Sequence, residues 1–395
     1  MTRSGPALLS GRAAIAGIGA TEFSKESGRT ELRLAAEAVL AAVADAGLRP
    51  ADVDGLVTFS QDANAEVAVA RATGIGELRF FGRVEYGGGA ACATVMHAAM
   101  AVSTGAADVV VCYRAFNERS GRRFGQPNAG LGGDPSSLGL EMSWHVPFGL
   151  ATPAAWVAMA ARRYMHVYGA SSEDFGAVAV TMRRHAAANP AAWFYGRPIT
   201  LADHQASRWV AEPLHLLDCC QESDGAQALV VTTPERARDL PQPTVMVHAV
   251  AQGAGENQDM MTSYYRDSIT GLPEMGLVAR QLWNTSGLAP DDIQAAIIYD
   301  HFTPLALPQF EEFGFCARGE AKDFIRDGNI ELGGRLPINT NGGQLGEAYI
   351  HGMNGIAEGT RLVRGTSTNQ PAGVEHVLVT AGTMVPTSAL LLGAA

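Results

Sequence analysis

The hydrophobic pattern of this chain forms units in which an amphipathic helix precedes a short buried strand. In residues 31–47 (ELRLAAEAVLAAVADAG) the apolar side chains recur at helical spacing. A glycine and then a proline follow in residues 47–58 (GLRPADVDGLVT). Glycine caps helices and proline cannot continue them, so we expect the helix to end there. The apolar run that closes this segment predicts a buried strand.

The same unit recurs about 240 residues later along the chain. Residues 275–287 (MGLVARQLWNTSG) predict the helix. Residues 287–299 (GLAPDDIQAAIIY) then repeat the glycine, the proline and the apolar run. One such similarity could arise by chance, so a second one in the same order is the stronger indication of a duplication.

That second similarity joins residues 107–115 (ADVVVCYRA) to residues 374–383 (VEHVLVTAGT), and both predict short buried strands. We therefore predict an α/β protein made of two similar halves, at 10–235 and 243–395. An insertion-rich region at about 115–215 interrupts the first half. Helices that alternate with strands predict mixed, mostly parallel sheets with helices on their faces.

Composition narrows the class of protein. The chain has 395 residues, of which 47% are hydrophobic and 17% charged, as in a packed globular enzyme. A net charge of −11 argues against nucleic acid and anionic membranes as partners. No uninterrupted apolar run reaches about 18 residues, so we expect no membrane span. The five cysteines are an odd number, which together with the lack of a secretion signal favours reduced thiols in the cytoplasm.

Three glycine-containing motifs accompany the duplication: YGGGAACATVMHAAMAV at 86–102, SDGAQALVV at 223–231 and NTNGGQLGEAYIHG at 339–352. Together they resemble the thiolase superfamily over nearly the whole chain. The motif IYDHFTP at 298–304 is similar to the lipid-transfer-protein branch, whose members are SCP2-thiolase-like, and within it to steroid side-chain aldolases of the Ltp2 type. The resemblance implies a duplicated thiolase fold with a layered α-β-α-β-α arrangement.

The chain departs from the thiolase pattern at each reactive position. Gly88 stands where a thiolase has its nucleophilic cysteine, and Thr380 stands where it has its second cysteine. Tyr349 replaces the catalytic histidine, and Tyr299 replaces the asparagine of the NEAF motif. Cys92 lies four residues beyond Gly88 and is expected to be a buried core residue. We therefore expect covalent acyl transfer through cysteine to be lost.

The resemblance to the Ltp2-type aldolases implies that Tyr299 and Tyr349 form a catalytic pair. An unperturbed phenol has a pKa near 10, so a phenol acting as base needs help from neighbouring groups or a relay. His301, two residues after Tyr299, is a candidate to orient or polarise a phenol. His351, two residues after Tyr349, is a further supporting candidate for the substrate site.

The resemblance also places Gly88 and Gly382 where the thiolase oxyanion hole uses backbone N–H groups. Glycine allows a backbone to approach a ligand closely. We further expect the missing side chain at Gly88 to leave room for a bulky, branched substrate.

The residues of the chain limit how an aldol cleavage could be driven. A Schiff base needs a desolvated lysine, and neither Lys25 nor Lys322 lies in an apolar run. The ten histidines show no paired metal-ligand spacing. A coenzyme A thioester needs neither aid, because hydrogen bonds to oxygen stabilise its enolate. We therefore expect no cofactor or metal of its own, with coenzyme A present only as part of the substrate.

The resulting prediction is retro-aldol cleavage of a β-hydroxyacyl-CoA, of a steroid side chain by resemblance. It would release a short acyl-CoA such as propionyl-CoA or acetyl-CoA, and a ketone or aldehyde. Two alternatives stay open: a non-catalytic acyl-CoA or lipid carrier, and a residual thiolase that uses Cys92 or Cys316. The acyl chain, the ring system, the coenzyme A contacts and the division of acid and base between the tyrosines also stay open.

The resemblance implies two protein partners. Thiolase-fold proteins generally dimerise, so a homodimer is expected. The Ltp2-type branch also implies a small DUF35-type partner with an OB-fold, which carries zinc in its own segment.

Overall fold

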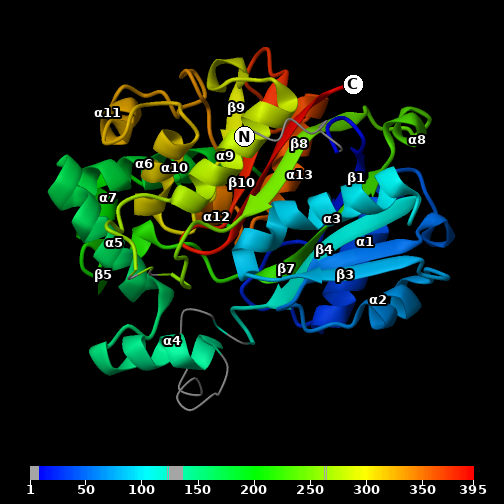
Figure 1. Cartoon of the computed structure of the whole chain (residues 1–395), viewed down its shortest axis with the longest axis horizontal. Helices are drawn as coiled ribbons and strands as arrows, with labels where there is room; N and C mark the ends of the chain where they lie inside the picture. Colours follow the sequence, from blue (N-terminus) through cyan, green and yellow to red (C-terminus); the bar gives the residue numbers. More distant parts are fainter. Residues whose placement is uncertain (1–8, 122, 124–136, 262, 264) are drawn as a thin grey trace.

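The computed structural model describes residues 9–121, 123, 137–261, 263 and 265–395, and its centre is one nine-stranded sheet (Figure 1). The strand order is β3-β2-β4-β7-β1-β8-β11-β10-β9. The strands are β1 Ala14–Ala20, β2 Gly55–Phe59, β3 Phe80–Val84, β4 Val109–Asn117, β7 Asp224–Thr232, β8 Val245–Gly253, β9 Ala295–Ile297, β10 His376–Ala381 and β11 Thr387–Ala394.

The predicted duplication is visible in the order of the strands. Inside the edge strand β3, the order towards the centre is β2-β4-β7-β1, and reading inward from the other edge gives β9-β10-β11-β8. The strands that the sequence pairs, β2 with β9 and β4 with β10, therefore occupy corresponding places. The two halves of the sheet join through a short ladder between β1 and β8, at Ala14–Met246 and Ile15–Val245. The proposed domain boundaries stay predictions; residue 235 falls inside α8 (Pro234–Arg238) and residue 243 just before β8.

The expectation of mostly parallel pairing is wrong. Among the described residues, β2–β3, β2–β4 and β9–β10 are parallel, while the five other ladders of the large sheet are antiparallel. Strand direction depends on the connection that delivers each strand. A buried strand covered on both faces is a continuous apolar run, so its sequence does not show which way it runs.

The helices form layers on both sides of each half-sheet (Figure 1). Helix α1 (Glu31–Asp45) packs on the outer face of β1, β4 and β7, and α9 (Pro273–Ser286) packs on the outer face of β8 and β11. Helices α3 (Ala91–Thr104) and α13 (Met353–Arg364) contact strands of both halves and share one apolar core with them. This is the α-β-α-β-α arrangement that the sequence predicts.

The repeated glycine–proline exit has the same local structure in both halves. Gly47 and Gly287 have positive φ angles of 68° and 74°, which glycine adopts without strain. A 3-10 turn follows each, at Pro50–Asp52 and at Pro290–Asp292. The last aspartate of each turn accepts a backbone N–H three residues earlier, at 2.8 Å in both cases. These contacts explain why both copies keep the spacing of glycine, proline and aspartate.

The inserted region of the first half packs largely against the second half. Helix α6 (Ser172–Ala188), whose N-cap residue is Ser171, contacts α11 (Ala321–Arg326) and α12 (Gly343–Gly346). Helix α5 lies near the 3-10 turn Thr303–Leu305, and α4 projects away from the main body (Figure 1). The remaining elements are α2 Glu66–Thr73, α4 Ser137–His145, α5 Pro153–Tyr168, α6 Ser172–Ala188, α7 Leu201–Ala206, β5 Trp209–Ala211, β6 Leu214–His215, α10 Ala306–Glu312, α11 Ala321–Arg326 and α12 Gly343–Gly346.

Helices long and apolar enough to cross a membrane are absent from the part of the chain that the structure describes.

Candidate active site

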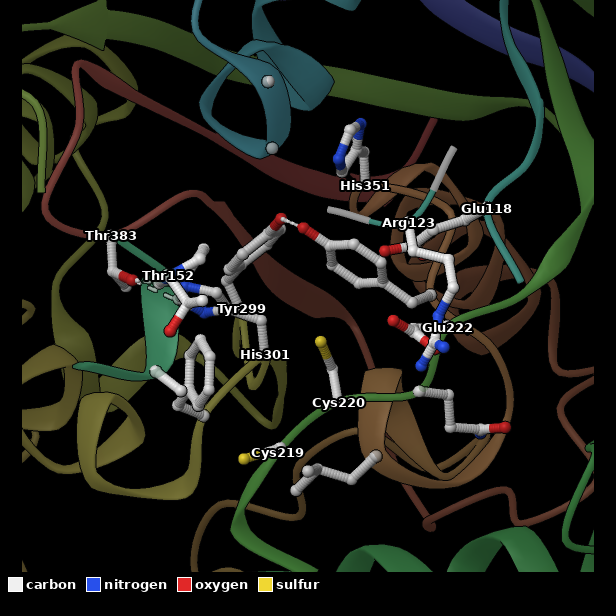
Figure 2. Close-up of a pocket in the computed structure, with 18 of the residues that line it drawn as sticks. Glu118, Arg123, Thr152, Cys219, Cys220, Glu222, Tyr299, His301, His351 and Thr383 are labelled. Carbon is white, nitrogen blue, oxygen red and sulfur yellow. Dashed lines mark hydrogen bonds and ion pairs between the residues drawn. The ribbon is translucent and has the colours of Figure 1, made fainter. Parts of the chain in front are cut away.

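A cavity of about 570 Å³ opens where the two halves and the inserted region meet. Its wall is formed by the 3-10 turn Gly87–Ala90 before α3, the loops after β9 and β10, and the segment before α13. All six predicted site residues line it: Gly88, Tyr299, His301, Tyr349, His351 and Gly382. Figure 2 shows Tyr299, His301 and His351 around this space, with Cys220 below them. The structure therefore brings the predicted residues together, while their roles stay predictions.

The two tyrosines meet through their hydroxyl groups. The Tyr299 and Tyr349 oxygens lie 3.3 Å apart, which is the dashed contact from Tyr299 in Figure 2. Both side chains are buried, with 3% and 9% of their surface exposed. Burial raises the pKa of both phenols above the usual value near 10. Both tyrosines are therefore protonated at neutral pH, and either hydroxyl can donate to the other.

The Tyr299 phenol occupies the space beside Gly88. A Cβ atom added to Gly88 would overlap the Tyr299 hydroxyl. The expectation that the missing side chain leaves room for the substrate is therefore wrong, because the phenol fills that room. Behind the ring, a Cβ at Gly352 would lie only 3.0 Å from Tyr299 Cε2. Two glycines thus hold the ring between them.

Gly382 lies where its own backbone closely approaches the backbone of Gly89. Its φ is +74°, and a Cβ there would come 2.5 Å from the Cα of Gly89. The loop after β10 therefore packs directly against the turn that contains Gly88. Both predicted backbone donors line the cavity next to the phenol pair.

A hydrogen-bond network fixes the backbone of Tyr299. Its N–H donates to Thr380 Oγ1 at 2.9 Å and to Gln309 Oε1 at 3.2 Å, while Gln309 Nε2 donates to its carbonyl at 2.9 Å. Thr380 also donates to Gln309 Oε1 at 2.7 Å. Thr380, which stands at the position of the second cysteine in the thiolase pattern, thus supports Tyr299 rather than facing the cavity.

The segment NTNGGQLGEAYIHG is a hydrogen-bonded support for Tyr349. Asn339 exchanges two hydrogen bonds with the backbone of Ile298, the residue before Tyr299, at 2.7 and 2.9 Å. The Tyr349 N–H donates to Ser223 Oγ at 3.1 Å. Gly342 has a φ of +106° and abuts Ala186, so the turn needs glycine there. These contacts tie the two tyrosine-bearing segments to each other.

The two histidines are neutral and buried. His301 lies with its ring centroid 4.9 Å from that of Tyr299, and burial lowers its pKa to about 3. Its ring nitrogens lie 3.4 and 3.5 Å from the Thr383 hydroxyl. Within the described residues they make no hydrogen bond to either phenol. His301 therefore packs against Tyr299, and the structure shows no hydrogen bond by which it would polarise the phenol.

His351 lies on the other side of the pair. Its Nδ1 accepts a hydrogen bond from Arg114 Nε at 3.2 Å, and its ring stacks on Phe116 with centroids 5.1 Å apart. Burial and the Arg114 charge lower its pKa well below the usual value. Arg114 itself forms a buried ion pair with Asp62 at 3.1 Å. His351 thus links the tail loop to strand β4.

The cysteines do not form a thiolase nucleophile. Cys92 is fully buried in the core, as the sequence predicts, and its Sγ faces the Val379 carbonyl at 3.6 Å. Burial raises the pKa of Cys92, and it raises the pKa of Cys316 to about 12. Neither lines the cavity. Cys219 and Cys220 do line it, but burial raises the pKa of Cys219 to about 12 and that of Cys220 well above 9.

Sequence reasoning missed two kinds of residue in the cavity wall. Glu118, directly after β4, is buried there with 3% exposed surface. Its spacing from Arg114 and Phe116 at two-residue intervals was a usable signal, because alternate residues of a strand share a face. Basic side chains were missed because several separate segments deliver them: Lys25, Arg119, Arg123, Arg183 and Arg208. Groups of three or more histidine, cysteine or acidic residues suited to a metal ion are absent from the described part of the chain.

Comparison with known proteins decides the family. A family profile described as "Thiolase C-terminal domain-like" matches residues 255–394. A protein of Thermomonospora curvata named "Steroid side-chain-cleaving aldolase" is 72% identical, over 98% of this chain and 99% of its own. The chain belongs to the steroid side-chain aldolases of the thiolase superfamily.

Two further comparisons place the chain within this aldolase family. A Mycobacterium tuberculosis protein named "17-hydroxy-3-oxo-4-pregnene-20-carboxyl-CoA lyase" is 70% identical, over 98% of this chain and 100% of its own. A solved structure described as "Ltp2-ChsH2(DUF35) aldolase" is 71% identical, covers 98% of this chain and 99% of its own, and superposes with a TM-score of 0.94. The resemblance to the Ltp2-type aldolases that the sequence indicates is confirmed.

Proposed function

We propose that this aldolase-family protein cleaves a β-hydroxyacyl-CoA of a steroid side chain by a retro-aldol reaction. The products would be a short acyl-CoA such as propionyl-CoA and a steroid ketone. The observation that carries the proposal is the pair of phenols, 3.3 Å apart, at the place where a thiolase would hold its cysteine. A pair of phenols can donate and accept protons but cannot form an acyl-enzyme like a thiolate.

The chemistry divides into proton removal, bond cleavage and proton return. Loss of the hydroxyl proton starts the cleavage, and the electron pair of the carbon–carbon bond moves into the thioester as an enolate. Hydrogen-bond donors preorganised around the enolate oxygen lower this barrier. The backbone N–H groups of Gly88 and Gly382, which line the cavity, are the proposed donors. A phenol then protonates the α-carbon.

The relatives suggest the class of substrate. One is named for the cleavage of steroid side chains and another for a 17-hydroxy-3-oxo-4-pregnene-20-carboxyl-CoA. We propose a substrate of this class, with a tertiary hydroxyl β to the thioester carbonyl. Apolar side chains of the wall, including Phe194, Leu216 and Met261, suit a steroid ring system. The basic side chains of the wall suit the phosphates of coenzyme A.

The proposed partner is a DUF35-type protein. The solved structure that is 71% identical is described as a complex with such a protein. We propose that this chain assembles with a DUF35-type OB-fold partner, which would bring zinc of its own. Within this chain we propose no cofactor, with coenzyme A entering as part of the substrate.

A homodimer is proposed from the exposed edge of the sheet. Strand β3 is the outermost strand of the N-terminal half, and its Phe81 side chain is 61% exposed. Unpaired edges with exposed apolar residues are normally covered by another chain or element. Tyr86 and Met100 add exposed apolar surface nearby. Because all five cysteines are free thiols, we also propose a cytoplasmic location.

The test is a direct assay of cleavage. The purified chain, with and without a DUF35 partner, is incubated with a 17-hydroxy steroid 20-carboxyl-CoA, and released acyl-CoA and steroid ketone are quantified by mass spectrometry. We expect cleavage by the wild type and none by Tyr349→Phe, which should still bind the substrate analogue without the hydroxyl. Binding without cleavage by the wild-type complex would instead identify a lipid or acyl-CoA carrier.

A further inference from the structure

The phenol pair leaves one step of the reaction without an acceptor. Both phenols are buried, and burial together with neighbouring charges raises their pKa values. A phenol that takes the hydroxyl proton must therefore pass its own proton on at once, because a buried phenolate is unfavourable. The two histidines already accept or contact other groups, at Arg114 and at Thr383. The question is which other group in the cavity can hold a proton.

Glu118 has the position required of such a group. It continues the face of β4 that carries Arg114 and Phe116, since alternate residues of a strand point the same way. Arg114 contacts His351, and the Phe116 ring meets the Tyr349 ring edge-on with centroids 6.5 Å apart. Glu118 comes next on this face and lines the same cavity as both tyrosines. Figure 2 shows Glu118 on the side of the cavity that faces away from Thr383.

Glu118 and Tyr349 are anchored on the same residue. The Glu118 N–H donates to the Ser223 carbonyl at 3.2 Å, and the Tyr349 N–H donates to Ser223 Oγ at 3.1 Å. The charge of Glu118 also acts on both phenols and raises their pKa values. The carboxylate is therefore within electrostatic range of both phenols, and the backbones of Glu118 and Tyr349 share an anchor at Ser223.

The carboxylate is buried but has an oxygen to spare. Glu118 is 3% exposed, and within the described residues its Oε2 has no hydrogen-bond partner. Buried polar atoms normally have partners, so an unpartnered oxygen in a cavity wall is available to accept a proton or a hydrogen bond. The charged and titratable groups around it come from the loop after β1, from β4, from the segment after β4 and from the segment before β7: Lys25, Arg114, Arg119, Arg123, Cys220 and Glu222.

We propose that Glu118 is the proton acceptor of the retro-aldol reaction, receiving the proton of the substrate hydroxyl through the Tyr349 phenol. This inference rests on the proposed function and adds the division of roles between the two tyrosines. Tyr349, whose backbone shares the Ser223 anchor with Glu118, relays the proton that leaves the substrate. Tyr299, whose hydroxyl lies against Gly88, supplies the proton that the α-carbon receives.

The proton balance closes within the chain. The substrate hydroxyl gives its proton to the Tyr349 oxygen, and the Tyr349 proton moves through a water molecule in the shared cavity to the Glu118 carboxylate, whose Oε2 has no protein partner among the described residues. The electron pair of the carbon–carbon bond becomes the enolate, which takes a proton from Tyr299. The Tyr299 phenolate regains a proton from Tyr349 across their 3.3 Å contact, and Glu118 returns its proton to Tyr349. The net change moves one proton from the hydroxyl to the α-carbon, with no further reactant.

This role predicts a definite pH dependence. Burial, and the nearby negative charge of Glu222, raise the pKa of Glu118 to about 8. Glu118 accepts a proton only as a carboxylate, so cleavage should be slow below this pH and should rise to a plateau above it. The Lys25 and Arg114 charges act in the opposite direction on the same pKa.

The first test is Glu118→Gln in the chain with its DUF35 partner, assayed for kcat and KM between pH 6 and 10. We expect kcat to fall by about 100-fold or more, because a positioned general base typically contributes that much. KM should change little, and the rise with pH near 8 should disappear. Glu118→Asp, which keeps a carboxylate, should restore part of the rate and the rising limb. A Glu118→Gln rate within about threefold of wild type, with the limb intact, would overturn the proposal.

The second test keeps Glu118 and changes only its surroundings. Glu222→Gln removes a negative charge that raises the Glu118 pKa, so the rising limb should move to lower pH. This variant decides the matter even if Glu118→Gln does not fold, since an unshifted limb would overturn the proposal. Failure of the proposed function looks different, because then the wild-type complex itself releases no acyl-CoA at any pH.

Discussion

The contact between Gly88 and the Tyr299 phenol makes Gly88→Ala a decisive perturbation. The added methyl group would overlap the Tyr299 hydroxyl. The ring cannot retreat the other way, because Gly352 already holds it from behind. Carbon–oxygen contacts settle at roughly 3.5 Å, so the phenol has to move by ~1 Å or more, towards Tyr349 and the cavity. The smallest possible side chain should therefore displace a proposed catalytic hydroxyl.

Two magnitudes follow from that displacement. A misplacement of about 1 Å in an active site can cost about 100-fold in rate, so we expect kcat to fall by roughly that factor. Overpacking a close-packed interior typically costs about 1–3 kcal/mol, so the free energy of unfolding should fall by a similar amount. Rate and stability should therefore both decrease by comparable free energies, since 100-fold in rate corresponds to about 2.7 kcal/mol.

The assay is steady-state cleavage of the steroid thioester, with urea unfolding measured in parallel. Gly76→Ala is the matched control, because a Cβ at Gly76 meets nothing within 4 Å; its rate and stability should equal those of the wild type. The double variant Gly88→Ala/Tyr299→Phe should recover only part of the stability and no cleavage, because the overlapped oxygen is gone but the ring carbon Cζ would still lie 2.4 Å from the added Cβ. Turnover of Gly88→Ala within about twofold of wild type would refute this account of the site.

Three further outcomes are expected. Thr380→Val, unlike Thr380→Ser, should lower the free energy of unfolding by about 1 kcal/mol because the Tyr299 N–H loses an acceptor at 2.9 Å; equal urea midpoints would contradict this. Asp62→Ala should cost about 3–5 kcal/mol, measured in the same way, since it leaves the buried Arg114 charge unpaired. Iodoacetamide at pH 7 should leave turnover intact, because burial keeps the cysteines as thiols; inactivation would point to a cysteine mechanism.

The sequence was most informative where one residue pattern has one structural solution. Glycine, proline and aspartate follow the helices at 31–45 and 273–286 at the same spacing, and they form the same turn in both halves. The six residues that the resemblance indicates also lie in a single cavity of the structure, although they are spread between positions 88 and 382. Strand direction was not readable, because an apolar run is the same in either direction.

The interior of the site was less predictable for a different reason. A glycine at position 88 predicts free space beside it. The sequence does not show which neighbouring side chain fills that space. The contribution of Glu118 depends on burial, and a carboxylate after a strand is more often solvated. The supporting role of Thr380 depends on its distance to a backbone N–H, which only three-dimensional structure provides.

The overlap between position 88 and Tyr299 also constrains how substitutions at the two positions can be combined. A cysteine at position 88 has a Cβ atom, and that atom cannot coexist with the Tyr299 ring in its present place. A side chain at position 88 is therefore compatible with Tyr299 only if the phenol shifts, with the losses of rate and stability expected for Gly88→Ala. The residues at positions 88 and 299 are coupled for steric reasons, so an exchange between a cysteine and this phenol pair is least costly when both positions change together.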